Sequence, residues 1–186
     1  MTLPTVTLPA DCWAYSRCTA RSSAGCPPHR RSSAASAAAS PPGGISLAKA
    51  EKMAERESKI HDVAIEAVPT AEAAVEGASI VCTTTAAETP ILKGAWLAAG
   101  AHVNAVGSSI KFTRELDTDA VVRSRLFVDR TESTVNESGD YLFPKEEGAI
   151  DETHIQGEIG DLSLGNITGR LSKEENTLFI SLGLAI

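Results

Sequence analysis

The sequence is marked first by what it does not contain. No continuous run of eighteen apolar residues occurs in it, so no segment is predicted to span a membrane. The first residues lack the charged start and apolar core of a secretory signal. None of the four cysteines, at positions 12, 18, 26 and 82, forms a CxxC pair, which argues against a zinc site or a disulfide framework. We therefore expect no bound metal and a reducing, cytoplasmic setting.

Positive charge is also scarce, and it is unevenly distributed. The net charge of the 186 residues is −7, which argues against a broad basic face for nucleic acid. Residues 1–44 hold four arginines and one aspartate, a net charge of +3. The remaining 142 residues hold 13 basic and 23 acidic side chains, a net charge of −10. The change in composition suggests a boundary near Gly43-Gly44.

The segment 1–44 has no hydrophobic rhythm of either helical or strand period. It carries three of the four cysteines and the low-complexity run RRSSAASAAASPPGG. Such a segment buries too little apolar surface to order itself, so we expect it to be disordered or poorly packed. The sequence thus divides into an unmatched low-complexity segment, 1–44, and a structured part, 45–186.

From Gly44 onward helices and strands alternate. Ser46 is placed to cap a helix through Glu57, with Leu47, Ala50, Met53 and Ala54 on one face. Strands are expected at 62–68, 79–85, 101–107 and 125–130, and helices at 70–77 and 117–125, with a short helical turn at 113–116. Apolar strands joined by short helices indicate a parallel sheet covered on both faces. We predict an α/β fold, a partial Rossmann-like sheet with flanking helices.

Two expected strands end in small polar residues. One ends in Thr83-Thr84-Thr85 and the other in Val106-Gly107-Ser108-Ser109. Ligands of open α/β sheets bind at the carboxyl ends of the strands, and hydroxyls with exposed amides suit ribose, amide and phosphate groups. Glycine would let a flat ring approach the main chain. The alternative, that the threonines only favour a strand and cap the next turn, stays open.

Several unusual strings resemble the ornithine cyclodeaminase/mu-crystallin family. They are IVCTTTAAETPIL (80–92), GAWLAAGAHVNAVGSS (94–109), TRELD (113–117), VVRSRLFVDRTESTVNESGDYLFPKEEGAI (121–150) and TLFISLGLA (177–185), in family order. The resemblance covers roughly residues 45–186. It implies an NAD(P)-binding Rossmann domain, NAD or NADP as cofactor, a small amino- or imino-acid substrate and the family's usual homodimer.

The resemblance also implies where the cofactor contacts lie. Thr83 and Thr85, with Thr84 between them, correspond to the family's threonine-rich cofactor edge, and Val106 and Gly107 to the loop beside the nicotinamide. Ser181 resembles the serine that closes over the cofactor. Ser109 stands where the cyclodeaminases carry a proton-transferring aspartate, and a serine does not relay a proton as a carboxylate does. The resemblance therefore points toward ketimine reductase rather than cyclodeaminase chemistry, with the catalytic residues left unassigned.

Other features depart from the family. No GxGxxG occurs, although a dinucleotide site of this kind uses such a turn for the pyrophosphate. The family's substrate domain is also missing, and Ile180 stands where a lysine is usual. The alternatives are therefore a truncated, inactive fragment or a non-catalytic binder of small ligands. A shifted reading frame through residues 1–44 is one hypothesis for the loss, testable from the nucleotide sequence.

Isolated residues receive structural interpretations. We expect His102 to be a hydrogen-bonded structural residue and Cys82 to be a small buried side chain. His154 is expected on a solvated helix face rather than at a metal. The segment Asn136 to Asp140 is expected to form a turn, and Glu146-Glu147 to face solvent.

Overall fold

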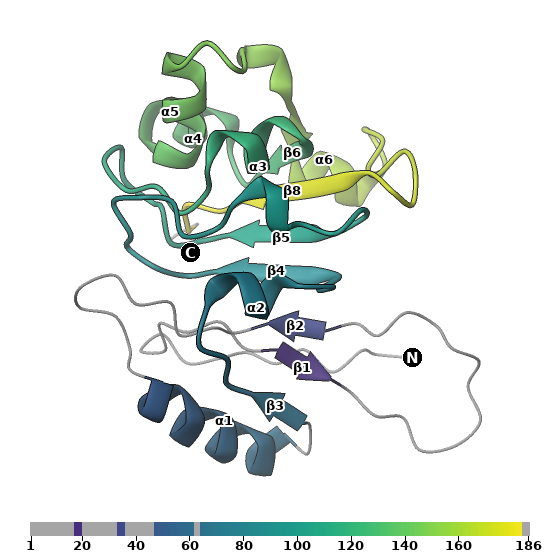
Figure 1. Cartoon of the computed structure of the whole chain (residues 1–186). Helices are drawn as coiled ribbons and strands as arrows, with labels where there is room; N and C mark the ends of the chain where they lie inside the picture. The colour runs from purple at the N-terminus through teal and green to yellow at the C-terminus, as the bar shows by residue number, and fades with distance from the viewer. Residues whose placement is uncertain (1–16, 20–32, 36–46, 62–63, 184–186) are drawn as a thin grey trace.

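A computed structural model describes residues 17–19, 33–35, 47–61 and 64–183 (Figure 1). Most of the segment 1–44 lies outside these residues, and so does most of what was predicted for it. Two short strands within it are described, β1 (Arg17–Thr19) and β2 (Ser33–Ala35). β2 pairs in parallel with β4, while β1 pairs antiparallel with both β2 and β3 (Ala64–Glu66).

Five parallel strands form the larger part of the sheet. In spatial order they are β4 (Ile80–Thr83), β5 (His102–Ala105), β8 (Asn176–Ile180), β6 (Ser124–Val128) and β7 (Ile155–Glu158). The predicted α/β, Rossmann-like parallel sheet is confirmed. The last strand, β8, lies between β5 and β6, so residues near the end of the described chain pair directly with residues 102–105. The pattern along the sequence gives no sign of this insertion.

Six α-helices and two 3₁₀ turns connect the described strands. They are α1 (Leu47–His61), α2 (Ala71–Val75), η1 (Gly94–Trp96), α3 (Thr118–Val122), α4 (Thr131–Glu137), α5 (Gly139–Glu146), η2 (Glu152–His154) and α6 (Ile159–Leu164). The predicted helices beginning near residues 47, 71 and 118 are confirmed. Side-chain oxygens cap two of them, Thr70 accepting from the Ala73 N–H and Asp117 from the Ala120 N–H.

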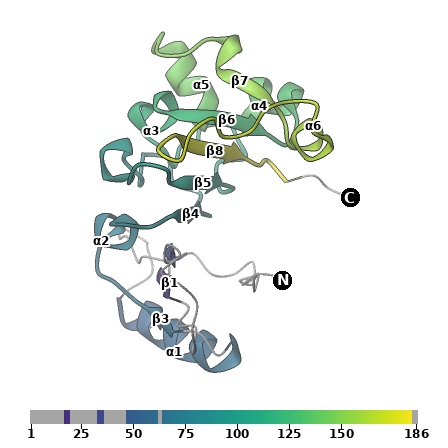
Figure 2. The same ribbon diagram turned by 90° about the vertical axis from the view of Figure 1, so that its right-hand side faces the viewer.

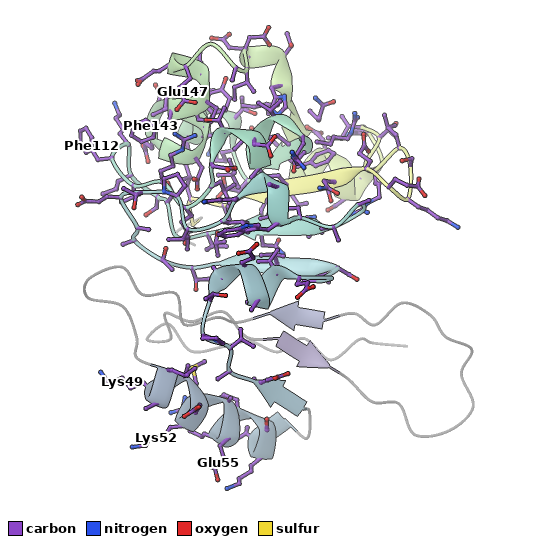
Figure 3. The ribbon with its side chains drawn as sticks, in the orientation of Figure 1. Lys49, Lys52, Glu55, Phe112, Phe143 and Glu147 are labelled. Carbon is purple, nitrogen blue, oxygen red and sulfur yellow. The ribbon has the colours of Figure 1, made fainter. Side chains whose placement is uncertain are left out.

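The packing of α1 follows its sequence pattern in part. Ala50 and Ala54 are buried and Met53 is half-buried, while Leu47 stays exposed. Lys49, Lys52 and Glu55 project from the surface of α1 (Figure 3).

The predicted helical turn at 113–116 is wrong. The chain is extended there, and Leu116 forms a parallel bridge with Leu92. The carbonyl of Glu115 accepts the N–H groups of Ile91 (2.8 Å) and Leu92 (2.9 Å). This pairing with a segment more than twenty residues away satisfies the backbone groups that a local helical turn would have used.

One face of the parallel sheet carries the core. Val81, Val103, Leu178 and Leu126 lie in register across β4, β5, β8 and β6, and all are buried. The helices α2, α3 and α5 pack their buried residues on this face. Figure 2 views the sheet roughly along its strands, with α2 and α3 to the left and α6 to the right.

The opposite face of β4 and β5 is more polar than predicted. Cys82 is exposed there, so its interpretation as a buried side chain is wrong. The ring of His102 bonds Thr177 Oγ1 (2.8 Å) and Asn104 Oδ1 (3.2 Å), which agrees with the structural role predicted for it. The expectation that the sheet is covered on both faces fails for β4 and β5, since no described helix lies over this part of the sheet (Figure 2).

The segments after β6 also differ in part from expectation. Asn136 lies in α4 and Asp140 in α5, so the expected turn is reduced to the single junction at Ser138. His154 lies in η2, and its Nε2 is 3.0 Å from the carbonyl oxygen of Val121. Glu146 and Glu147 are exposed, as predicted. In the described part of the chain, no helix is long and apolar enough to cross a membrane.

Candidate functional site

The carboxyl ends of four parallel strands are joined by main-chain hydrogen bonds. Val106 N donates to Thr83 O (2.9 Å), and Ser181 N donates to Ala105 O (2.9 Å). Asp129 N continues the series toward β6 by donating to Ile180 O (3.3 Å). The segments 83–85, 106–109 and Ser181 therefore lie on adjacent strands at one edge of the sheet. We call this edge the carboxyl rim; its loops leave the sheet on the left of Figure 1.

The side chains predicted to contact a cofactor differ in exposure. Thr84, Val106 and Ser109 are exposed on the rim, and Thr85, Gly107 and Ser181 are half-buried. Thr83 is 0% exposed, because it follows the same alternation as Val81 and faces the core. Six of the seven predicted residues are therefore at least partly accessible at one edge. The Thr83 side chain serves the interior of the protein.

The Thr83 side chain faces inward because it bonds to a buried carboxylate, which the sequence patterns did not identify. Thr83 Oγ1 donates to Glu115 Oε2 (2.7 Å), and Gly107 N donates to the same oxygen (2.9 Å). Thr85 N donates to Glu115 Oε1. The Glu115 side chain is fully buried. Burial raises the pKa of the Glu115 carboxyl, and the hydrogen bonds from Thr83, Thr85 and Gly107 oppose that rise.

A second buried carboxylate holds the main chain of the first. Asp140 Oδ1 accepts the N–H groups of Glu115 (2.8 Å) and Leu116 (2.9 Å). Asp140 Oδ2 is buried and has no hydrogen-bond partner among the described residues. Burial raises the pKa of the Asp140 carboxyl to about 7, the charge of Glu115 adds to the rise, and the bonded N–H groups and Arg114 oppose it.

Gly107 is required at the rim for a reason other than the one predicted. A Cβ on Gly107 would lie 2.0 Å from Thr85 O, 2.3 Å from Thr85 N and 2.6 Å from Glu115 Oε1. The space that a side chain would fill is therefore occupied by the neighbouring strand end and its carboxylate. Glycine at this position permits close packing of the two rim segments.

A third carboxylate lies under the β8 end of the rim. Asp129 Oδ2 accepts from Ser181 Oγ (3.2 Å) and from Leu182 N (2.7 Å), and its Oδ1 accepts from Arg130 N (2.7 Å). The single proton of Ser181 is directed at Asp129, and the hydroxyl oxygen accepts the N–H of Gly183 (3.4 Å), which leaves one lone pair of that oxygen without a partner among the described residues.

An exposed apolar loop follows the rim residues. Ile110 and Phe112 are exposed, Phe112 by 77% of its surface. Beside this loop, Arg114 forms an ion pair with Glu147 (2.8 Å), and its guanidinium lies 5.4 Å from the ring centre of Phe143. Figure 3 shows Phe112, Phe143 and Glu147 on the same side of the molecule. The described residues contain no group of three or more His, Cys, Asp or Glu side chains placed to hold a metal ion.

Parallel strands whose adjacent carboxyl ends present hydroxyls and bare main chain are the arrangement of Rossmann-like dinucleotide-binding domains. Residues 44–186 match the Ornithine cyclodeaminase/mu-crystallin family, and the chain belongs to it. The resemblance noted in the sequence strings is thereby confirmed.

Three relatives show the range of the family. The chain is 40% identical over 114 residues to a Delta(1)-pyrroline-2-carboxylate reductase of Colwellia psychrerythraea, covering 61% of this chain and 36% of that protein. It is 34% identical over 138 residues to the ketimine reductase mu-crystallin of Macropus fuliginosus, covering 74% and 41%. The solved Thermococcus litoralis Delta(1)-pyrroline-2-carboxylate reductase, in complex with NADH and L-proline, is 42% identical with a TM-score of 0.73 over 76% of this chain and 44% of that one.

These comparisons establish the kind of cofactor that the family uses. The solved relative binds NADH, so the family contains NAD-dependent reductases that act on small amino- or imino-acid compounds. The chain spans less than half the length of these relatives.

Proposed function

We propose that this chain forms the nicotinamide-binding part of an NAD(P)-dependent reductase that acts on the C=N bond of a small imino acid. The cofactor would supply the hydride, and the carboxyl rim would hold the nicotinamide end of it. Thr84, Thr85, Val106, Gly107, Ser109 and Ser181 are the proposed contacts, with Thr83 acting from below through Glu115.

The observation that carries this proposal is the hydrogen-bond polarity of Ser181. Its hydroxyl donates to Asp129 and accepts from Gly183 N, so it has one lone pair left to accept from a ligand and no proton left to donate. A nicotinamide carboxamide offers the N–H group that such an acceptor binds. The residues present therefore fit the nicotinamide end of the cofactor.

The choice of reductase over cyclodeaminase rests on Ser109. This residue is exposed at the rim, where a proton-transferring aspartate would be needed for deamination. A serine hydroxyl has no accessible charged form near neutral pH, so it cannot exchange a proton as a carboxylate does. Relatives named pyrroline-2-carboxylate reductase and ketimine reductase favour the same choice.

A second candidate is a chain that binds a small ligand without catalysis. The absence of a GxGxxG turn anywhere in the sequence favours it, since nothing among the described residues replaces that turn for the pyrophosphate. In that case the rim would bind nicotinamide-like or imino-acid ligands weakly.

Titration of NADH fluorescence with the full chain tests the proposal. We expect saturable binding in the micromolar range, and oxidation of bound NADH when Δ1-pyrroline-2-carboxylate is added. Saturable binding without oxidation would favour the non-catalytic candidate. A signal that does not saturate at millimolar NADH would overturn the nicotinamide site itself.

Ser181→Ala is expected to weaken NADH binding about tenfold, the effect of losing one ligand hydrogen bond. The change removes the acceptor but leaves the main-chain bond between Ser181 N and Ala105 O in place. Ser172→Ala is the matched control, since Ser172 is exposed before β8, at the opposite end of that strand. Equal affinities of the two variants for NADH would contradict the assigned contact.

A further inference from the structure

Glu115 lies beneath the carboxyl rim and bonds to two of its segments. One segment carries Thr83 and Thr85, and the other carries Gly107. Its two oxygens accept from Thr83 Oγ1, Thr85 N and Gly107 N. The first two donors come from the end of β4, and the third comes from the loop after β5. No other described side chain bonds to both segments, so their relative position depends on this carboxylate.

The contacts of Glu115 suit its ionised form, and they oppose the rise in the pKa of the carboxyl that burial causes. All three donors point at its oxygens, and a carboxylate is the side-chain group that only accepts. A glutamine would turn an NH₂ group toward at least one of these donors. The hydrogen bonds from two main-chain amides and a hydroxyl thus hold a negative charge in the protein interior.

No positively charged side chain of the described residues forms an ion pair with that carboxylate. Among the ion pairs of the described residues none involves Glu115. The neighbouring Arg114 directs its guanidinium to Leu116 O, Thr118 and Glu147. Asp140, the other titratable group near Glu115, bonds to its main-chain N–H and adds no positive charge. A buried, unpaired charge is screened less than a surface charge, so its field extends to the rim above it.

We propose that Glu115 is a positioning residue of the cofactor site, and that its charge makes the rim favour the cationic, oxidised nicotinamide ring over the neutral, reduced one. This inference rests on the proposed function, because it requires a nicotinamide at the rim. It adds a role for a residue that does not itself reach the surface. Glu115 sets the spacing of Thr85 and Gly107 and the electrostatic potential that a ring lying on them would experience.

The test compares the affinities of the full chain for NAD⁺ and NADH, by calorimetry and by fluorescence. Glu115→Gln should raise the ratio of the NAD⁺ to the NADH dissociation constant about tenfold, because only the oxidised ring carries the positive charge that loses its partner. A residue with a merely structural role would weaken both forms by the same factor. An unchanged ratio in a folded Glu115→Gln variant would therefore overturn the proposal.

Two further variants separate charge from geometry. Glu115→Asp keeps the charge but shortens the reach to Thr85 and Gly107, so both affinities should fall while their ratio stays within about twofold of wild type. A ratio that changes more than twofold in Glu115→Asp would refute the electrostatic role, and this outcome can be read even if Glu115→Gln does not fold. Glu175→Gln is the control. It removes one charge immediately before β8, at the opposite end of the parallel strands, and should leave the ratio unchanged.

The same experiment distinguishes this inference from the proposed function. If wild-type chain binds neither NAD⁺ nor NADH, the nicotinamide site fails and the role of Glu115 fails with it. If wild type binds both and Glu115→Gln leaves their ratio unchanged, only the role of Glu115 fails.

Discussion

Gly107→Ala is expected to destabilise the protein by about 3 kcal/mol or more, at the upper end of what overpacking costs. The added Cβ would lie 2.0 Å from Thr85 O and 2.6 Å from Glu115 Oε1, well inside contact distance. Both obstacles are fixed, since Thr85 O is main chain and Glu115 is held by three hydrogen bonds. The rim segments must therefore separate. Denaturant unfolding followed by circular dichroism measures the loss.

Gly160→Ala is the matched control for this substitution. Gly160 lies in α6, and a Cβ there would meet nothing within 4 Å. Alanine at a helical position that is free of clashes stabilises by up to about 1 kcal/mol relative to glycine. If Gly107→Ala and wild type unfold at the same denaturant concentration, the two rim segments are not packed as described.

Asp140→Asn is expected to remove a pH dependence of stability. The folded-state pKa of Asp140 is about 7, against an ordinary value of 3.8. Between these values the folded protein keeps a proton that the unfolded chain has released, so stability falls as pH rises from about 4 to about 7 and is then constant. The shift corresponds to at most about 4 kcal/mol. Asparagine keeps an acceptor for the Glu115 and Leu116 N–H groups but does not titrate.

The measurement is the free energy of unfolding of wild type and variant at pH 5 and pH 8. Asp140→Asn should gain stability relative to wild type between the two pH values, and it should be the more stable protein at pH 8. Glu146→Gln, an exposed acid-to-amide change on the same helix, should show no such gain. A difference between Asp140→Asn and wild type that is the same at both pH values would mean that Asp140 is not the titrating group.

Local sequence signals were sufficient to predict the helices and strands whose pattern is complete within a few residues. The helices expected at 70–77 and 117–125 both form, and Thr70 and Asp117 each accept from the N–H three residues later. The strands ending at Thr83 and Ala105 were predictable from their apolar composition, and both belong to the parallel sheet. The extended segment 113–116 was not, because its partners at Ile91 and Leu92 lie far away in sequence.

The candidate site was likewise predictable only in part from the sequence. Its residue types at the ends of β4 and β5 were visible in the sequence, and their adjacency followed from the prediction of a parallel sheet. The carboxylates beneath them were not visible. Glu115 stands between Arg114 and Leu116 in the string Arg-Glu-Leu-Asp. This string is equally compatible with a solvent-exposed loop.

By itself the sequence determined the alternation of helices and strands, the family, and the small polar character of the strand ends, because each depends on residues close together along the chain. Only the tertiary structure decided that Ser181 lies beside Val106, that Thr83 faces inward, and that Glu115 and Asp140 are buried. The physical reason is the same for all of these. A polar group is held where its hydrogen-bond partners converge, and the partners lie thirty-two residues apart for Thr83 and Glu115 and fifty-two apart for Ser181 and Asp129.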